Sequence, residues 1–266
     1  MIKLNGTEIR PTIFPDKTSQ VWKLPEMCFE GKIYTIEWEF ENEAELFHLC
    51  QLVDLIRFGH IPKELTLHLP YLPYGRQDKD ISNSNTFALI TFGRIINTLK
   101  FDKVTTLDAH SIIGFQNIER FDSLYPLEEI EFAHNEVNAD CEAFPDKGAS
   151  DRYLCNHEDI IGHKVRDQLT GYITEYNIEG NPEGKDILIV DDICDGGMTF
   201  KLMAKELYNQ GANSVHLYVT HGIFSKGVET LRADGIQRIF TKDGEYDGHP
   251  NNIDIALLQR TELSNL

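Results

Sequence analysis

The chain has 266 residues and a formal net charge of -18 at pH 7, and 41% of its residues are hydrophobic. A surface this acidic repels nucleic acid and anionic membranes, so we expect neither as a partner. No apolar run approaches the roughly 20 residues of a membrane span, and the first residues show no apolar signal segment. The five cysteines form no CxxC pair, which favours reduced thiols in a cytoplasmic protein.

Short β-rich segments alternate with helical segments, which predicts an α/β protein with mainly parallel sheets flanked by helices. A polar stretch at 123–148, broken by Pro126 and Pro145, is expected to join two halves, residues 1–126 and 127–266. Asn42 is the expected N-cap of the first helix. The predicted elements in chain order are a strand at 33–40, a helix at 42–58, a strand at 65–69, a helix at 87–99, a strand at 104–107, a turn at 180–184, a strand at 186–190, a helix at 198–210, a strand at 214–220, a helix at 225–233 and strands at 236–240 and 253–257.

The strand predicted at 186–190 runs into two carboxylates and a glycine-containing turn before the next helix. Glycines let backbone N–H groups approach an anion, and a helix start adds partial positive charge. The two carboxylates can accept hydrogen bonds from sugar hydroxyls. The pattern predicts a cradle for a sugar phosphate, and a plain turn with an acidic helix start is the alternative. The residues of this cradle are Asp191, Asp192, Asp195, Gly196, Gly197, Met198 and Thr199.

This segment resembles the motif that binds phosphoribosyl pyrophosphate (PRPP) in type I phosphoribosyltransferases and in PRPP synthetases. A second segment separates the two groups. Residues 70–78 read PYLPYGRQD and are similar to the PYxxYxRQD segment of the PRPP synthetase, or ribose-phosphate pyrophosphokinase, family, which the transferases lack. The resemblance implies that Arg76, Gln77 and Asp78 bind ATP.

Three further segments resemble the same family. The D-x-H pattern that ends at His110 implies a ligand of ATP and its Mg²⁺. Residues 145–152 are similar to P-D-x-G-G-x-x-R, with Ala149 in place of the second glycine, which implies that Asp146 is associated with the metal. The segment from Phe14 to Asp16 resembles one that contacts the adenine of ATP across a subunit boundary.

Lys164 and Arg166 match two cations that the family carries on a flexible loop. Two residues apart on an extended loop, they would face the same side. The resemblance implies that they stabilise the charge of the group being transferred, whereas the bare pattern fits a solvated pair equally well. Residues 220–225, THGIFS, also resemble a T-H-x-x-F-S segment of the family.

The resemblance implies two phosphoribosyltransferase-like domains, with ATP bound by residues 1–126 and the ribose phosphate by residues 127–266. The implied reaction is Mg²⁺-dependent transfer of a diphosphate from ATP to the anomeric hydroxyl of ribose 5-phosphate, which yields PRPP and AMP. A homo-oligomer, either a dimer or a hexamer, is expected.

The chain departs from the family inside the phosphate loop, where Gly196 replaces a threonine and Met198 replaces a glycine. Lys17 and Thr18 also replace a Gly-Glu pair after the adenine segment. The loop changes leave the acceptor open, and ADP-ribose, converted to its 1-pyrophosphate for NAD rebuilding, is an alternative. A type I phosphoribosyltransferase and a non-catalytic regulatory paralogue are further alternatives.

Overall fold

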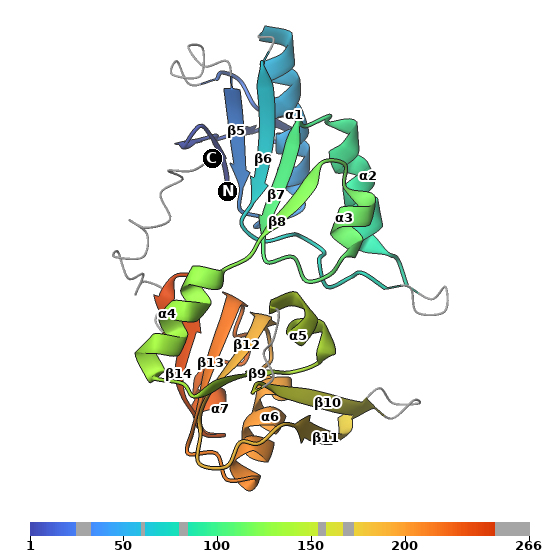
Figure 1. The fold of residues 1–266 in the computed structure, drawn as a ribbon. Coiled ribbons are helices and arrows are strands. Elements are labelled where there is room, and N and C mark those ends of the chain that lie inside the picture. Colours follow the sequence, from blue (N-terminus) through green and yellow to red (C-terminus); the bar gives the residue numbers. More distant parts are fainter. Residues whose placement is uncertain (25–32, 60–61, 80–84, 154–157, 167–172, 248–266) are drawn as a thin grey trace. The chain divides into compact units, whose positions relative to one another are not determined.

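The chain folds into two compact units, Met1–Tyr125 and Pro126–Leu266, each built around its own sheet (Figure 1). The structure is a computed structural model that describes residues 1–24, 33–59, 62–79, 85–153, 158–166 and 173–247. Among these residues no helix has both the length and the apolar character needed to cross a membrane.

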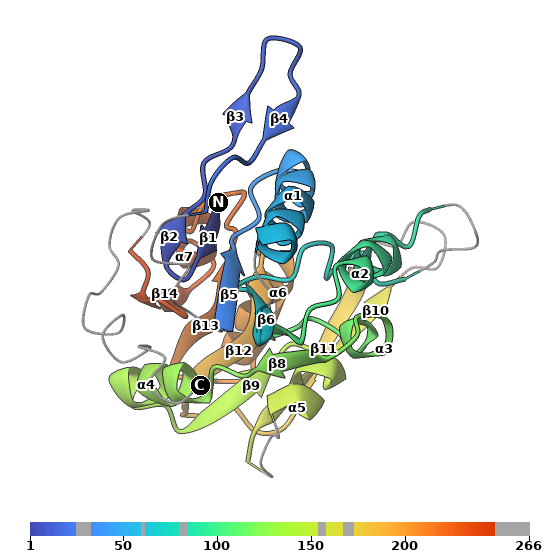
Figure 2. The same cartoon turned by 90° about the horizontal axis from the view of Figure 1, so that it is seen from above.

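The first unit has a six-stranded sheet in the order β2-β1-β5-β6-β7-β8, in which β5 to β8 run parallel. Strands β3 and β4 form a separate hairpin, which extends away from α1 in Figure 2. The elements are β1 (Ile2–Leu4), β2 (Thr7–Glu8), β3 (Thr12–Ile13), β4 (Ser19–Gln20), β5 (Ile33–Trp38), α1 (Ala44–Gly59), β6 (Glu64–Leu69), α2 (Ala88–Thr98), β7 (Lys103–Leu107), α3 (Ile113–Asn117) and β8 (Phe121–Leu124).

The second unit has a seven-stranded sheet in the order β11-β10-β9-β12-β13-β14-β15, and its central pairs are parallel. The edge strands β11 and β15 are antiparallel to their neighbours. The elements are α4 (Leu127–Val137), β9 (Cys141–Phe144), α5 (Lys147–Tyr153), β10 (Ile160–Arg166), β11 (Ile173–Glu179), β12 (Asp186–Cys194), α6 (Met198–Asn209), β13 (Ser214–Gly222), α7 (Glu229–Arg232), β14 (Ile236–Thr241) and β15 (Gly244–Glu245).

Strand β12 is apolar on both faces because helices cover the sheet on both sides. Ile187 and Ile189 belong to a buried cluster that includes residues of α6 and α7. Leu188 and Val190 belong to a second cluster that includes residues of α4 and α5. A continuous apolar run is the pattern that a strand buried on both faces requires.

The α/β class with mainly parallel sheets is confirmed, and the early elements follow the sequence closely. In α1 the Asn42 carboxamide accepts a hydrogen bond from the amide of Ala44 at 3.1 Å, as an N-cap does. The helix then buries Leu49, Leu52 and Ile56 against the sheet. This spacing of three and four residues is the helical period on which the prediction rested.

One predicted element is wrong, and one cannot be compared with the structure. The two units divide after Tyr125, inside the polar stretch at 123–148, and the rest of that stretch contains α4 and β9, whose apolar residues are interrupted by polar ones. The helix predicted at 225–233 is reduced to α7 (Glu229–Arg232), because Gly227 adopts φ 72° and ends any helical run before it. The strand predicted at 253–257 lies outside the described residues.

Candidate functional site

Asp191 and Asp192 lie within strand β12 rather than after it, because β12 stays paired with β13 as far as Cys194 and Gly222. Their cationic partner is Arg152 of α5. Its Nη1 lies 2.9 Å from Asp192 Oδ1 and 3.8 Å from Asp191 Oδ1. The Asp192 side chain is only 3% exposed and the Arg152 side chain 10%, so this is a buried charge cluster. A buried carboxylate needs such a partner to remain ionised.

The pKa of Asp191 is raised well above its usual range. Burial is the main cause, and the neighbouring Asp192 adds a like charge and shares a hydrogen bond. Arg152 and the backbone amide of Asp192, which donates to Asp191 Oδ1 at 2.9 Å, oppose the shift. Burial next to a second carboxylate therefore makes it costly to ionise Asp191, and a ligand that donates hydrogen bonds from hydroxyls would lower that cost.

Lys164 and Asp146 form a second ion pair in the same unit. Asp146 follows β9 directly before α5, and Lys164 lies in β10. Lys164 Nζ donates to Asp146 Oδ2 at 3.0 Å, and the amide of Ala149 donates to Asp146 Oδ1 at 3.1 Å. Although burial opposes it, Lys164 together with this amide holds the pKa of Asp146 below its usual value. Asp146 is therefore a carboxylate at neutral pH.

Tyr176 of β11 joins the two ion pairs into one neighbourhood. Its hydroxyl donates to the carbonyl oxygen of Pro145 at 3.0 Å. Its pKa is raised, first by burial and then by the charges of Asp146 and Asp191. Gly162 makes room for the ring, because a Cβ there would lie 2.1 Å from the Tyr176 hydroxyl oxygen.

Lys164 and Arg166 occupy a strand, which corrects the expectation of a flexible loop. Both lie in β10, which pairs with β11 from Ile161 to Arg166. The register of this pairing shifts between Val165 and Arg166, so the simple two-residue alternation does not apply there. The side chain of Arg166 lies outside the description, and only Lys164 is placed relative to the site.

The turn from Asp195 to Thr199 leads directly into α6, and its backbone requires glycine. Gly197, the N-cap position of α6, has φ 74°, and a Cβ there would lie 2.7 Å from the Cδ2 of Leu231. As a glycine, Gly197 gives the helix no side-chain cap, and the first turn of α6 carries no acidic residue. The N–H groups at this helix start are therefore oriented as in an anion site. Met198 is 56% exposed at the same place.

In the first unit, the segments predicted to bind ATP follow two neighbouring strands. The turn that leads to Arg76 and Gln77 follows β6, and His110 comes after β7. Strands β6 and β7 are parallel, with Leu69 opposite Thr106, so both segments leave the same edge of the sheet. Arg76 and Gln77 are exposed, His110 is half-buried and Asp78 is buried.

Phe14 and Asp16 lie in the β3–β4 hairpin. The Asp16 carboxylate accepts hydrogen bonds from the amide and the hydroxyl of Thr18, at 3.0 and 2.7 Å. Phe14 packs edge to face against Trp22, with 6.3 Å between the ring centroids. Asp16 therefore stabilises the hairpin turn.

His110 and Asp146, the residues expected at a metal, lie in different units. Among the described residues, no three histidine, cysteine, aspartate or glutamate side chains gather in a metal-binding arrangement. Mg²⁺ bound with a nucleotide takes many of its ligands from phosphate oxygens and water and needs only one or two protein groups. An ionised Asp146, or the half-buried imidazole of His110, fits that requirement.

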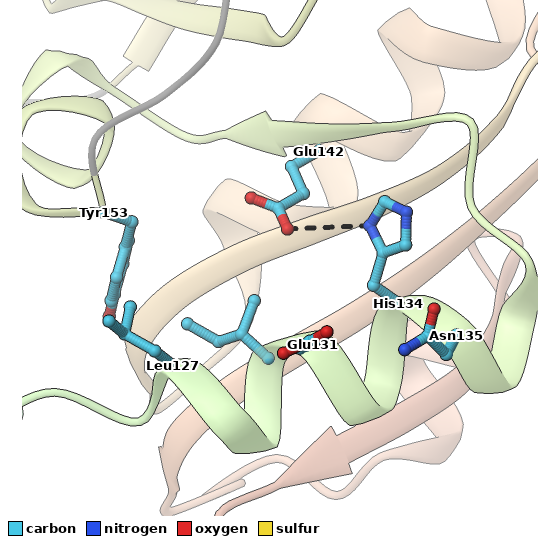
Figure 3. Close-up of a pocket in the computed structure, with 7 residues that line it drawn as sticks. Leu127, Glu131, His134, Asn135, Glu142 and Tyr153 are labelled. Atoms are coloured by element: carbon cyan, nitrogen blue, oxygen red, sulfur yellow. Dashed lines mark ion pairs between the residues drawn. The ribbon is translucent and has the colours of Figure 1, made fainter.

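A hollow of about 380 Å³ lies elsewhere on the second unit, between α4, β9 and the end of α5 (Figure 3). In it, His134 Nδ1 lies 3.6 Å from Glu142 Oε1. Burial raises the pKa of Glu142, with a further contribution from Asp159, while His134 opposes the shift. None of the site residues expected from sequence lines this hollow, so we do not assign the site to it.

Sequence reasoning assigned no role to Arg152 or Tyr176. Arg152 ends the 145–152 motif, and this place in the pattern is the available signal for it. Tyr176 gives no local signal, because its position depends on the pairing of β10 with β11 and on the small residue at Gly162.

A family model described as "Phosphoribosyl transferase domain" matches residues 156–248. The ribose-phosphate pyrophosphokinase of Rhizobium meliloti (strain 1021) is 32% identical over 199 residues, 71% of this chain and 63% of that protein. The one from Mesorhizobium japonicum is 31% identical over 216 residues, 77% of this chain and 68% of that protein. The one from Saccharolobus solfataricus is 26% identical over 243 residues, 87% of this chain and 82% of that protein.

Among solved structures, phosphoribosylpyrophosphate synthetase from Mycobacterium smegmatis matches with a TM-score of 0.70. The match covers 88% of this chain and 79% of that one at 19% identity, so this likeness concerns the fold.

The fold and the matched domain define an α/β protein of the phosphoribosyltransferase type. More narrowly, the chain belongs to the ribose-phosphate pyrophosphokinase family, since it is 31% identical to the Mesorhizobium japonicum protein over 68% of that protein's length. It spans only 63% of the length of the Rhizobium meliloti relative.

Proposed function

We propose that this protein transfers a diphosphate group from ATP to the anomeric hydroxyl of a 5-phosphorylated ribose and releases AMP. The observation that carries the proposal is the charge cluster of the second unit, where Asp146, Arg152, Lys164, Asp191 and Asp192 converge. A diphosphate transfer requires cations near the transferred group and acceptors for sugar hydroxyls. This cluster contains both kinds of group.

In the proposed reaction, the anomeric hydroxyl oxygen attacks the β-phosphorus of ATP. The bond from that phosphorus to the oxygen shared with the α-phosphate breaks, AMP leaves, and the hydroxyl proton is released. Positioning and charge stabilisation supply the catalysis, without a covalent intermediate on the protein. A Mg²⁺ ion held with the ATP phosphates, with Asp146 or His110 as protein ligands, would neutralise part of the triphosphate charge.

We assign each side chain a role in this reaction. Asp191 and Asp192 accept hydrogen bonds from the ribose hydroxyls, and the loop Asp195–Thr199 binds the 5′-phosphate at the start of α6. Lys164 and Arg166 stabilise negative charge on the transferred group. On the ATP side, the assigned residues are Phe14, Asp16, Arg76, Gln77, Asp78 and His110.

ADP-ribose is the second candidate acceptor, favoured by the shape of the phosphate loop. A Cβ added to Gly196 would meet only Lys226 within 4 Å, at 3.6 Å or more, and Met198 is largely exposed. Lys226 is the neighbour of Gly196, so a 5′ substituent larger than a single phosphate would extend along the exposed Met198. Parallel assays with ribose 5-phosphate and ADP-ribose separate the two acceptors by their kcat/KM.

The direct test is incubation with Mg-ATP and each ribosyl acceptor, with AMP measured by chromatography and the product by phosphorus NMR. Lys164→Ala should lower kcat about 100-fold or more, as losing a group that stabilises transition-state charge does, while the KM for ATP changes little. Lys185→Ala is the control, since it removes a lysine that precedes β12 at the opposite end of that strand. No AMP with any acceptor would overturn the proposal.

Two other functions give different results in the same assay. A phosphoribosyltransferase would release pyrophosphate from PRPP without ATP, and a non-catalytic paralogue would fail to turn over ATP. The family resemblance further supports a homo-oligomer in the cytoplasm, which light scattering of the purified protein and cell fractionation would test.

A further inference from the structure

The loop that follows β13 is fixed against the phosphate loop by its backbone. The amides of Ile223 and Phe224 both donate to the carbonyl oxygen of Cys194, at 2.9 and 3.1 Å. Cys194 is the residue immediately before the Asp195–Thr199 loop. The amide of Gly227 then donates to the carbonyl oxygen of Phe224 at 2.8 Å and closes a turn. Ser225 and Lys226 are the central residues of this turn, which therefore determines where Lys226 projects.

Lys226 lies across Gly196, the position where the family carries a threonine. A Cβ built on Gly196 would lie 3.6 Å from Cε, 3.7 Å from Cδ and 4.0 Å from Nζ of Lys226. The end of the lysine side chain, and not merely its backbone, is therefore beside the phosphate loop. Branched side-chain atoms at residue 196 would compete for this space, which glycine leaves to the lysine.

Lys226 is exposed, and within the part of the chain that the structure describes no carboxylate forms an ion pair with its ammonium group. Lys201, in the first turn of α6, differs in this respect, because its Nζ is paired with Asp234 Oδ2 at 2.9 Å. In a chain of net charge -18, an exposed ammonium beside a helix start whose N-cap is glycine is the local cation that a phosphate site needs.

We propose that Lys226 is a specificity-determining residue that binds the phosphate at the 5′ end of the acceptor. It acts together with the N–H groups at the start of α6, and Gly196 gives it access to the bound phosphate. This inference rests on the proposed function for the identity of the acceptor. The binding of a phosphate anion at Lys226 can be measured without catalysis.

The experiment compares Lys226→Met with Lys226→Arg and with Lys205→Met. Lys205 is an exposed lysine further along α6, so Lys205→Met removes the same charge from the same unit. Calorimetry measures the binding of inorganic phosphate and of ribose 5-phosphate to each purified full-length variant. Steady-state assays measure the KM for the acceptor and the KM for ATP separately.

Lys226→Met should weaken phosphate binding and raise the acceptor KM about tenfold, the effect expected from losing a charge-assisted hydrogen bond. The KM for ATP should stay unchanged, Lys226→Arg should recover most of the loss, and Lys205→Met should resemble the wild type. Equal, small effects of Lys226→Met and Lys205→Met on phosphate binding would overturn the inference. If no acceptor is turned over while phosphate binding depends on Lys226, the proposed function fails and the phosphate site stands.

Discussion

At the scale of single residues, the second unit concentrates charge in an unusual way for a buried strand. Asp191 and Asp192 are adjacent, yet Arg152 is the cation that lies close to both. Buried like charges raise the free energy of the folded state unless they are fully paired. We infer that the protein retains this unfavourable pair because a sugar ligand needs it, a trade of stability for function that is common in binding sites.

The Asp191→Asn substitution should therefore stabilise the protein at neutral pH. The pKa of Asp191 is near 3.8 in the unfolded chain and higher in the folded protein. The wild type therefore loses folding stability as the pH rises from the first pKa through the second. Asparagine does not ionise, so the free energy of unfolding of the variant should be about 1–2 kcal/mol larger than that of the wild type at pH 7. The excess should shrink toward zero near pH 4. Urea unfolding across this pH range measures this difference in stability. The affinity of the Asp191→Asn variant for the acceptor should be lower than that of the wild type.

Asp186, at the other end of β12, provides a control of opposite sign. Hydrogen bonds from the Ser214 hydroxyl and the Asn213 amide lower its pKa, so its carboxylate contributes stability that is lost as pH falls. Asp186→Asn should destabilise the protein at pH 7 and leave acceptor binding unchanged. If both substitutions destabilised the protein at neutral pH, the interpretation of Asp191 as a strained carboxylate would be wrong.

At the scale of elements, the sequence predicts the buried strands best. Strands such as β12 and β13 are continuous apolar runs bounded by turns, and their residues are almost all buried, so local pattern and tertiary environment agree. The predictions are wrong where the chain's course depends on distant contacts. β10 becomes a strand by pairing with β9 and β11, and the polar residues of its exposed part give no such signal.

The candidate site likewise contains residues that the sequence indicates and residues that only the tertiary structure places there. The loop that we propose to bind the phosphate could be recognised in the sequence because its residues are consecutive. Arg152 is placed by α5, Tyr176 by the pairing of β11 with β10, and Lys226 by the loop after β13. Such contacts between separate elements leave little trace in local sequence.

The start of α6 offers a prediction that separates backbone conformation from crowding. Gly184 and Gly197 have nearly the same φ, 72° and 74°, but a Cβ at Gly184 would meet nothing within 4 Å. At Gly197 it would lie 2.7 Å from Cδ2 of Leu231, a residue that is 1% exposed and belongs to the buried cluster beneath α6. Gly184→Ala should cost about 1 kcal/mol of stability, and Gly197→Ala about 3 kcal/mol.

Chemical denaturation of the two alanine variants measures these costs, and phosphate binding distinguishes their consequences. Only Gly197→Ala should weaken binding, because it displaces the turn that orients the N–H groups of α6. Equal stability losses for the two variants would mean that Leu231 yields to the new methyl group and that crowding plays no part.

At the scale of the whole molecule, the chain has separate hydrophobic cores. The core of the first unit is built from residues between Ile2 and Ile118. Within the described residues, the buried members of the two clusters of the second unit, one on each face of its sheet, lie between Ile130 and Phe240. A domain with its own core can unfold on its own, so a single two-state transition is not the expected behaviour of this chain.

We therefore expect two transitions in thermal unfolding, each sensitive to its own core. Leu67 and Ile189 are both fully buried in central strands of their respective sheets. Leu67→Ala should lower one transition and Ile189→Ala the other, each by about 3 kcal/mol for the affected unit. Ribose 5-phosphate should raise only the transition that Ile189→Ala lowers, because ligand stabilises the unit that binds it. If each substitution lowered both transitions equally, the two units would not unfold independently, and this prediction would be wrong.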